Sequence, residues 1–430
     1  MASWRYTAVA DVATLVSGGT PSRNDPRYWG GMVPWVTCKD MKSDRLGDSS
    51  ERLTDAGLEA GSRLVPPGSV LIVIRGMILA RDVPVALATK SVAFNQDLKA
   101  LLPKCGIDSE FLLYAIKSKV RELQQMTARA AHGTKSLTTS NVANLEVPFP
   151  PLAEQRQIAA VLSAVQRAIE RQERLVALTA QLKKALMHKL FTEGTRGEPL
   201  KQTEIGPVPQ SWTVAPLATF TESFQYGTSV KCGYDVKGLP VLRIPNVVGG
   251  HLDVSDLKYG NPKRNELETT RLRICDLLFV RTNGVRENAG RCSMYRGELG
   301  DSCYFASYLI RARLCDGLLP GFLEEYTRTE VGVRLLAGRA ARTADGKFNI
   351  NTGTLETLLV PKPNINEQKT IAGALALIDT KARNHLASKV TLESLFRTLL
   401  HQLMTAQIRV HDLDLSALER KEAAQAVGAV

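Results

Sequence analysis

The sequence lacks any long apolar run. No stretch of the 430 residues reaches the roughly 18 consecutive apolar residues of a membrane-spanning helix. Residues 1–6 also lack the apolar segment of a secretory signal peptide. These absences exclude membrane-anchored and secreted classes, so we expect a water-soluble, cytoplasmic protein. Hydrophobic residues still make up 44% of the chain, which is sufficient for two separate domain cores.

Cysteine pairs with metal-binding spacing are also missing. The seven cysteines are scattered, and no two follow the Cys-x2-Cys spacing that brings two thiolates to one metal ion. The sequence therefore favours neither a metal site nor a disulfide framework. We interpret all seven as reduced, mostly buried thiols. They are Cys38, Cys105, Cys232, Cys275, Cys292, Cys303 and Cys315.

Catalytic motifs are absent or reduced to chance matches. No Gly-x4-Gly-Lys-Ser/Thr segment is present to bind nucleotide phosphates. An adenine methyltransferase needs a glycine-rich loop and an Asn/Asp-Pro-Pro-aromatic segment, and Asn261–Arg264 has basic residues at the last two positions. The triplets Asp97–Lys99 and Asp235–Lys237 resemble parts of nuclease sites, but neither has a second carboxylate on an adjoining strand. We therefore predict a chain with no catalytic site.

The sequence does contain an excess of positive charge. Its 55 Lys and Arg residues against 43 Asp and Glu residues give a net charge of +12. Such an excess favours a polyanionic partner. The alternative on charge alone is a basic soluble protein that has no such partner.

An internal repeat organises the chain. Residues Pro151–Leu162 return as Asn364–Leu375, and the offset of 213 positions also relates 188–192 to 401–405. Weaker matches keep the same order upstream. They pair Gly19-Thr20 with Gly227-Thr228, Phe111-Leu112 with Phe322-Leu323, and Leu145–Pro148 with Leu358–Pro361. The layout is therefore variable, constant, variable, constant.

Each constant segment has the apolar periodicity of a long helix. Pro150-Pro151 and Asn366 mark the two starts, and Glu154 and Glu367 lie where the helix dipole favours an anion. The apolar stripes are Ile158, Leu162, Val165, Ile169, Leu175, Leu178, Leu182 and Leu186 in the first copy, and Ile371, Leu375, Ile378, Ala382, Leu392, Leu395, Leu399 and Leu403 in the second. We expect two helices of about 38 residues, each ~57 Å long. Since one leads into the second variable region and the other leaves it, we expect them to pack antiparallel as a coiled-coil spacer.

Both variable regions mix β-rich runs with helical segments. Strands are predicted over 69–74, 83–87 and 276–281, and helices over 109–126 and 319–336. The predicted fold class is α+β: two mixed α/β domains separated by two long antiparallel helices, related by a pseudo-twofold repeat. The predicted boundaries are domain 1 at 1–150, the first helix at 151–193, a linker at 194–207, domain 2 at 208–362, the second helix at 363–408 and a C-terminal tail at 409–430.

Several short segments, in this order along the chain, resemble a known family. They are Gly18–Ser22, Tyr28–Gly31, Val33–Val36, Phe94–Gln96, Val147–Gln155, Thr203–Trp212 and Phe305–Arg311. Together they resemble the specificity subunit of type I restriction-modification systems over nearly the whole chain. One departure is Asn364–Asn366, where the first copy has the family-like Pro151–Ala153.

The resemblance implies a non-catalytic DNA-binding subunit. In that family the two variable regions are target recognition domains for the halves of a bipartite double-stranded DNA site. The helices set the gap between the halves and dock two methyltransferase subunits, and restriction or translocase subunits complete the complex. S-adenosylmethionine would then belong to the methyltransferase, and we expect no cofactor in this chain.

DNA contacts are expected from loop residues that carry Arg, Lys, Asn or Gln, because these side chains bind phosphates or base edges. The candidates adjoin Gly, Ser, Thr or a strand end, from which a side chain can project. In the first domain they are Arg23, Lys39, Arg75, Gln96 and Lys135. In the second they are Arg243, Asn246, Arg281, Asn283, Arg342 and Lys347.

Two other interpretations stay open at this point. The chain could be a non-catalytic scaffold in which a coiled coil bridges two protein-binding domains, or an enzyme whose motif is unfamiliar. A steep salt dependence of duplex DNA binding separates a DNA-binding protein from a scaffold. Methyl transfer to DNA by the pure chain tests the enzyme.

Overall fold

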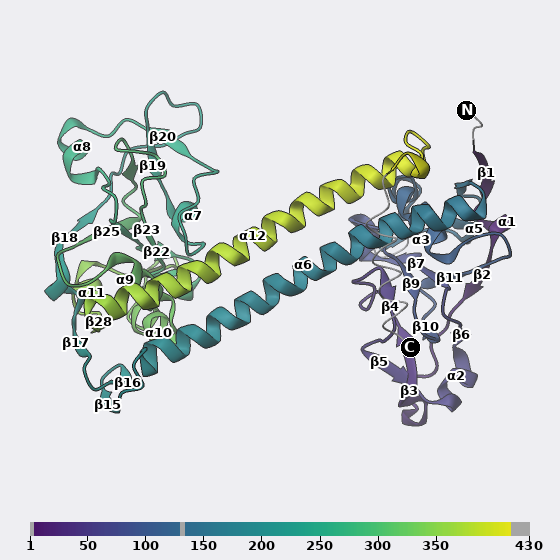
Figure 1. The fold of residues 1–430 in the computed structure, drawn as a ribbon, viewed down its shortest axis with the longest axis horizontal. Coiled ribbons are helices and arrows are strands. Elements are labelled where there is room, and N and C mark those ends of the chain that lie inside the picture. The colour runs from purple at the N-terminus through teal and green to yellow at the C-terminus, as the bar shows by residue number, and fades with distance from the viewer. Residues whose placement is uncertain (1–3, 130–133, 414–430) are drawn as a thin grey trace. The chain divides into compact units, whose positions relative to one another are not determined.

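The computed structural model describes residues 4–129 and 134–413 (Figure 1). The chain divides into two compact units. Unit 1 comprises Met1–Glu173 with Ala387–Val430, and unit 2 comprises Arg174–Leu386. Each unit therefore contains one recognition domain together with part of both long helices. Among the described residues, no helix is long and apolar enough to cross a membrane.

Unit 1 is built from four sheets. The largest has the order β2 (Ala13–Ser17), β11 (Leu98–Pro103), β7 (Val70–Val73), β9 (Val85–Ala88) and β4 (Arg45–Leu46). A second has the order β5 (Glu51–Leu53), β3 (Trp29–Val36), β10 (Val92–Phe94) and β6 (Leu64–Val65). A small sheet contains β12 (Ala128–Arg129), β13 (Lys135–Ser136) and β8 (Arg75–Gly76), and β1 (Arg5–Ala8) pairs with β14 (Glu146–Phe149). The helices are α1 (Val9–Val12), α2 (Asp55–Gly61), α3 (Ser109–Ser118), α4 (Val120–Gln125) and α5 (Thr139–Ala143).

Unit 2 repeats this plan. Its largest sheet has the order β18 (Thr221–Tyr226), β25 (Leu309–Leu314), β21 (Leu277–Val280) and β23 (Cys292–Met294). Beside it are β20 (Lys258–Gly260), β19 (Leu239–Leu242) and β24 (Tyr304–Phe305), and a small sheet of β22 (Thr282–Asn283), β27 (Phe348–Asn349) and β26 (Ala341–Arg342). Two pairs complete it: β17 (Thr213–Pro216) with β28 (Leu359–Lys362), and β15 (Leu200–Thr203) with β16 (Gly206–Pro209). The helices are α7 (Ile244–Val247), α8 (Arg264–Thr270), α9 (Pro320–Arg328), α10 (Glu330–Gly338) and α11 (Thr352–Glu356).

The buried strands explain where each core forms. All four residues of β7 are buried, as are all four of β21, because both strands are apolar throughout and lie inside a sheet. In unit 1 the start of the first long helix completes the core through Ile158 and Leu162. In unit 2 the start of the second long helix does the same through Ile371 and Leu375. The mixed α/β fold of each unit agrees with the prediction.

A buried glutamine at the start of each long helix confirms the repeat. Gln155 donates from Nε2 to the carbonyl oxygens of Gly106 and Pro150 and accepts from the amide of Asp108. Gln368 makes the same three bonds, donating to the carbonyl oxygens of Gly317 and Pro363 and accepting from the amide of Leu319. Both side chains are fully buried, so each fastens its helix to the domain that precedes it in the sequence.

One predicted pairing within the repeat is wrong by one residue. The amide of Gly19 donates to the carbonyl oxygen of Phe94 at 2.9 Å, and the amide of Thr228 donates to that of Phe305 at 2.9 Å. The equivalent segments are therefore Gly18-Gly19 and Gly227-Thr228. A Cβ atom on Gly18 or Gly227 would lie 2.2 Å from the same carbonyl oxygens. The residue directly before each donating amide must therefore be glycine.

The two long helices are α6 (Leu152–Glu193, 42 residues) and α12 (Ile365–Met404, 40 residues). In unit 1, Glu173 of α6 pairs with Lys389 of α12, and Glu154 pairs with Arg409, which follows α12. The helices therefore run in opposite directions there, as predicted.

The parts of the long helices in unit 2 show the same antiparallel arrangement. Lys183 of α6 pairs with Asp379 of α12 at 2.7 Å. Just beyond the end of α6, the amide of Thr195 donates to Glu367, which lies at the start of α12. In unit 2 the end of α6 therefore lies beside the start of α12.

The apolar stripes do not form one continuous seam between the helices. Ile158, Leu162 and Ile169 are buried in the core of unit 1. Leu178 and Leu182 are 49% and 58% exposed, and Leu395 is 44% exposed. The stripes therefore do not define which residues are covered, because the period of a helix does not say which neighbour lies over each position.

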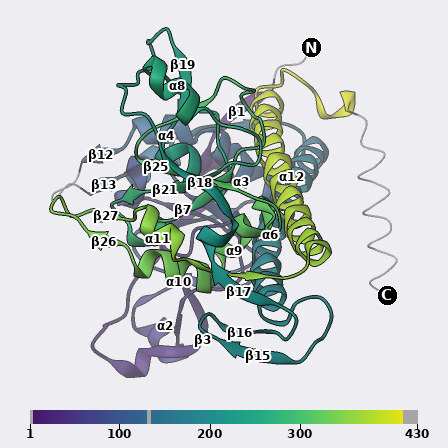
Figure 2. The ribbon, with the colours of Figure 1, turned by 90° about the vertical axis from the view of Figure 1, so that its left-hand side faces the viewer.

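Several segments differ locally from the prediction. Residues 194–207 were expected as a linker, but β15 and β16 form a hairpin beside β17 near the end of α6 (Figures 1 and 2), and Ile205 and Val208 are buried in the core of unit 2. The helix predicted over 109–126 is divided into α3 and α4, and that over 319–336 into α9 and α10. Of the predicted tail, Val410 is buried in unit 1, and residues 414–430 lie outside the described residues.

The prediction that most cysteines are buried is also wrong. All seven are free, but only Cys292 and Cys303 are buried, whereas Cys105, Cys275 and Cys315 are exposed. Burial raises the pKa of the Cys292 thiol well above its ordinary value and that of Cys303 to about 12. The thiols of Cys292 and Cys303 are therefore both protonated at neutral pH.

Candidate nucleic-acid interface

Six of the eleven predicted DNA-binding residues lie on, or directly beside, the two small sheets. In unit 1, Arg75 is on β8 and Lys135 on β13. In unit 2, Asn283 is on β22 and Arg342 on β26, while Arg281 precedes β22 and Lys347 precedes β27. The offset of 213 that relates the long helices also relates β12 and β13 to β26 and β27. We call these the unit 1 recognition sheet and the unit 2 recognition sheet.

Each recognition sheet forms where a buried strand leaves the core. After the apolar strand β7, the carbonyl of Ile74 accepts from the amide of Leu137 at 2.8 Å. After β21, the carbonyl of Arg281 accepts from the amide of Ile350 at 2.9 Å. The short strands that follow, β8 and β22, carry the polar side chains of Arg75, Thr282 and Asn283 outside the core.

Three cations on these sheets are available to a ligand. Arg75, Lys135 and Arg342 have no ion-pair partner among the residues that the structure describes. Arg75 and Arg342 are exposed, and Lys135 is half-buried. Unpaired guanidinium and ammonium groups of this kind bind phosphate oxygens and the acceptor edge of guanine.

The other three residues on the recognition sheets have local partners. The Arg281 guanidinium lies 4.8 Å from the ring centroid of Tyr226 and donates from Nη1 to the Ser307 carbonyl at 3.3 Å. Asn283 Oδ1 accepts from the Val285 amide at 2.9 Å and fixes the turn after β22. Lys347 pairs with Asp345 at 2.8 Å, and this raises the pKa of Lys347 and lowers that of Asp345 to about 2. That pair is exposed, so exchanging Asp345 for a phosphate costs little.

The remaining predicted residues of unit 1 lie near the second sheet. Arg23 forms a bidentate pair with Glu51, and its guanidinium lies 4.0 Å from the ring centroid of Trp29. The pKa of Arg23 is raised by its hydrogen bond to Glu51. Lys39 is exposed in the turn after β3, and Gln96 is exposed after β10, where it accepts a hydrogen bond from Thr20. The structure does not bring these three onto the unit 1 recognition sheet.

Asn246 and Arg243 have structural roles in unit 2. Asn246 is 1% exposed, donates to the carbonyls of Asp253 and Asp256, and accepts from the Arg243 amide at 2.8 Å. Its amide group therefore has no free atom to offer a base, which corrects its selection as a loop residue. Arg243 donates from Nη2 to Asp256. Both residues follow the end of β19, as the sequence criterion required, but the Asn246 side chain holds the start of α7 through the Arg243 amide, and Arg243 is engaged by Asp256.

Sequence reasoning missed two matched grooves beside the ends of the long helices. The first is in unit 2, has a volume of about 1220 Å³, and is lined by the end of α6, β16 and the junction of α9 and α10. The second is in unit 1, has a volume of about 850 Å³, and is lined by the end of α12 and the junction of α3 and α4. Lining residues Lys184, Met187, His188, Phe191 and Thr192 of the first groove recur in the second as Arg397, Leu400, His401, Met404 and Thr405. The sequence match of 188–192 with 401–405 was the available signal.

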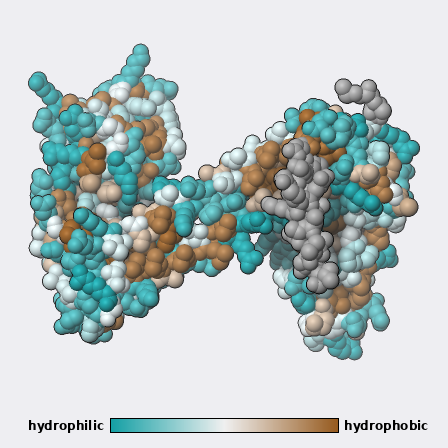
Figure 3. Space-filling model, in the orientation of Figure 1, coloured by the Kyte–Doolittle hydropathy of each residue, from teal (hydrophilic) through white to brown (hydrophobic). Residues whose placement is uncertain are grey.

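Both grooves combine mainly apolar surface with charged side chains. Figure 3 shows hydrophobic surface along the part of α6 that belongs to unit 2. The cationic lining residues of the unit 2 groove are Lys183, Lys184, Arg328 and Arg334. Those of the unit 1 groove are Lys117, Lys119, Arg121 and Arg397.

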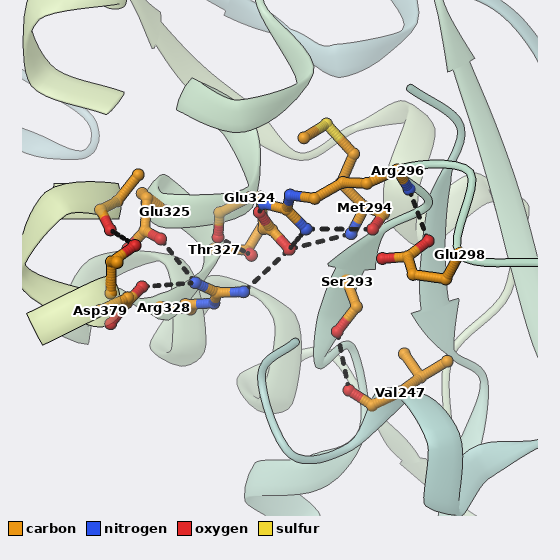
Figure 4. A network of polar contacts seen from close by, with 12 residues as sticks. Val247, Ser293, Met294, Arg296, Glu298, Glu324, Glu325, Thr327, Arg328 and Asp379 are labelled. Atoms are coloured by element: carbon orange, nitrogen blue, oxygen red, sulfur yellow. Dashed lines mark hydrogen bonds and ion pairs between the residues drawn. The ribbon is translucent and has the colours of Figure 1, made fainter. Parts of the chain in front are cut away.

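A buried ionic cluster adjoins the unit 2 groove (Figure 4). Glu324 is 1% exposed, pairs with Arg328 at 2.9 Å and Arg296 at 2.6 Å, and accepts from the Met294 amide. Burial alone would raise the pKa of Glu324, but Arg328 and Arg296 hold it below its ordinary value. Lys183 of α6 extends the cluster through Asp379, which fastens both long helices to α9 in unit 2.

Unit 1 replaces part of this cluster with aromatic rings. By the repeat, Phe396 is equivalent to Lys183 and Tyr114 to Glu325, and the two ring centroids lie 5.9 Å apart. The Tyr114 hydroxyl also bonds to Ser163 of α6 at 3.0 Å. The same helix-to-domain junction is therefore ionic in unit 2 and largely aromatic in unit 1.

Comparison with known proteins identifies relatives of this arrangement. The family model of the type I restriction modification DNA specificity domain matches residues 1–180. The MjaIX specificity subunit of Methanocaldococcus jannaschii is 26% identical over 260 residues, covering 57% of this chain and 59% of that subunit. The EcoKI specificity subunit of Escherichia coli K12 is 22% identical over 436 residues, covering 98% of this chain and 93% of that subunit.

A solved structure has the same fold. The crystal structure of the type I restriction-modification S subunit from M. genitalium aligns with a TM-score of 0.58 at 16% identity, covering 93% of this chain and 96% of that one. Residues 1–180 thus match the type I restriction modification DNA specificity domain, and nearly the whole chain is similar in sequence and fold to type I restriction-modification specificity subunits.

Proposed function

We propose that this chain selects the DNA sequence on which a type I restriction-modification complex acts, with each recognition sheet binding one half of a bipartite site. The observation that carries the proposal is the pair of repeat-related sheets that present the unpaired cations Arg75, Lys135 and Arg342. A net charge of +12 supports a polyanionic ligand. Lys39, Gln96 and Lys347 are exposed and extend the set of DNA contacts.

The chain acts without a catalytic site of its own in this proposal. Methyl transfer then requires a partner methyltransferase that supplies S-adenosylmethionine, and DNA cleavage requires restriction or translocase subunits. The missing nucleotide and methyltransferase motifs support this division of labour. The complex would act in the cytoplasm, where bacterial and archaeal DNA is located.

Two methyltransferase subunits would dock at the two matched grooves. Because the lining positions repeat, one protein surface could use both grooves, once in each unit. The exposed leucines Leu182 in unit 2 and Leu395 in unit 1 are also related by the repeat, and each offers an apolar contact on a long helix. A helical element of the partner suits these surfaces, since exposed leucines on a helix pack well against another helix.

The proposal is tested by measuring duplex DNA binding against salt concentration. The purified chain should bind random duplex with an affinity that falls steeply as salt rises, and with its methyltransferase it should methylate one bipartite sequence. A flat salt dependence would favour the protein-binding scaffold. Methyl transfer by the pure chain would show that it is an enzyme.

A further inference from the structure

Each recognition sheet also carries exposed apolar side chains beside its cations, and this inference rests on the proposed function. We propose that Ile78 and Met77 in unit 1, and Val285 in unit 2, contact base edges in the DNA groove and contribute sequence discrimination. The apolar base group that such side chains recognise is the thymine methyl group.

The repeat places Ile78 and Val285 at the same position. The hydrogen bonds from Leu137 to Ile74 and from Ile350 to Arg281 make Ile74 and Arg281 equivalent. Ile78 and Val285 each follow that point by four residues. Ile78 is 38% exposed and Val285 is 53% exposed, and the neighbouring Met77 is 68% exposed.

Both side chains project from turns that are internally fixed. The Ile78 carbonyl accepts from the amides of Arg81 and Asp82 at 2.8 and 2.9 Å, and the adjacent Leu79 is buried in the core of unit 1. The Val285 amide donates to Asn283 Oδ1, and its carbonyl accepts from the Asn288 amide at 3.1 Å. Since the backbone is held on both sides, the exposed positions are properties of the folded turns. Pre-organised contacts of this kind lose little entropy on binding.

Cationic groups adjoin both apolar positions. Arg75 lies three residues before Ile78, and Lys135 lies on β13, which packs against the turn of Met77–Ala80. In unit 2, Arg286 follows Val285 directly, and its guanidinium lies 5.4 Å from the ring centroid of Phe348 on β27. Scattered exposed apolar residues are normal on protein surfaces. Here the same position is apolar in both units, beside cationic side chains that suit phosphate, and this combination favours DNA over a protein partner.

The test is a selection of randomised half-sites by the complex of this chain with its methyltransferase. The variants are Met77→Ala with Ile78→Ala, and separately Val285→Ala. Each variant should lower the preference for the selected base pair over the other base pairs about tenfold, at one or two positions of a single half-site. Affinity for random duplex and its salt dependence should stay unchanged, because no phosphate contact is removed. Thermal unfolding of the variants should match the wild type, since the side chains are exposed.

Matched controls are Met32→Ala in unit 1 and Ile274→Ala in unit 2, which remove side chains that are 83% and 66% exposed away from the recognition sheets. Both controls should leave the half-site profiles unchanged. The inference is overturned if the variants also select unchanged half-sites, or if they lose affinity for the methyltransferase while discrimination is retained. Failure of the wild-type complex to select any sequence would instead overturn the proposed function.

Discussion

At the residue scale, the structure separates cations that are available to DNA from cations that are already engaged. Arg342 is exposed without an ion-pair partner in the part of the chain that the structure describes, whereas Arg23 is bound to Glu51 and lies over an indole ring. Both residues met the same sequence criterion, a basic residue beside small or polar neighbours. The partner of Arg23 comes from another strand, so no local pattern could have indicated it.

This difference predicts unequal effects on DNA binding. Arg342→Gln should weaken binding to duplex DNA about tenfold and reduce the slope of log affinity against log salt by about 1, because one phosphate contact is lost. Arg23→Gln should change that slope little. Filter binding over a salt series measures both. Equal slopes for the Arg342 variant and the wild type would contradict the assignment.

The buried carboxylate Glu324 predicts a dependence of stability on pH. Because Arg328 and Arg296 lower its folded-state pKa, its stabilisation is complete above its ordinary pKa of 4.5 and is lost as pH falls through the folded-state value. Glu324→Gln should cost about 3 kcal/mol at neutral pH, because the largely buried Arg328 loses one of its carboxylate partners and the half-exposed Arg296 loses Glu324. It should also flatten the fall in stability below pH 4.5.

Denaturant unfolding at neutral and acidic pH measures both effects. The matched control is Asp345→Asn, which breaks an ion pair whose partners are more than half exposed and should leave the free energy of unfolding almost unchanged. A Glu324→Gln variant as stable as the wild type would show that the ionic cluster does not stabilise unit 2.

At the element scale, Leu182 and Leu395 should contribute to docking without contributing to folding. Changing either to Asp should alter the free energy of unfolding by no more than about 0.5 kcal/mol, because both are exposed. Each substitution should weaken the binding of one methyltransferase subunit, and the double variant should not assemble with either. Ile274→Asp is the control away from the helices. Analytical ultracentrifugation of the mixed subunits gives the stoichiometry, and normal assembly of the double variant would exclude these faces.

The long helices and the repeat were predictable because their signals are local and periodic. A stripe of apolar residues over some 40 positions specifies a helix, and the match of Glu154-Gln155 with Glu367-Gln368 specifies the repeat. What covers each stripe was not predictable, since Ile158 enters a core whereas Leu182 stays exposed. The hairpin of β15 and β16 escaped prediction because its Gly and Pro residues are also typical of linkers.

The candidate site was predictable only in part, for a related reason. Sequence selected Arg75 and Lys135 separately, and β-pairing between distant segments brought β8 and β13 into one sheet. Asn246 was misjudged because two of its three partners depend on the fold of residues 253–256 around it. Long-range pairing of this kind leaves no signature in a single sequence.

At the scale of the whole molecule, the helices should act as a ruler between the two half-sites. Inserting seven residues after Ala177 in α6 and after Thr391 in α12 adds ~10 Å to each and keeps the same faces aligned. The recognised gap should grow by about 3 base pairs, with both half-sites unchanged. Mapping methylated bases in DNA treated with the variant complex measures the gap. An unaltered gap with intact activity would show that helix length does not set the spacing.

The two recognition domains should select their half-sites independently. A chimaera in which residues 1–150 are replaced by the recognition domain of another specificity subunit tests this, with methylated bases mapped in DNA exposed to the assembled complex. Because each recognition sheet is formed within its own unit, the account predicts that one half-site changes while the other half-site and the gap stay as in the wild type. A change in both half-sites, with the complex assembled and active, would contradict it.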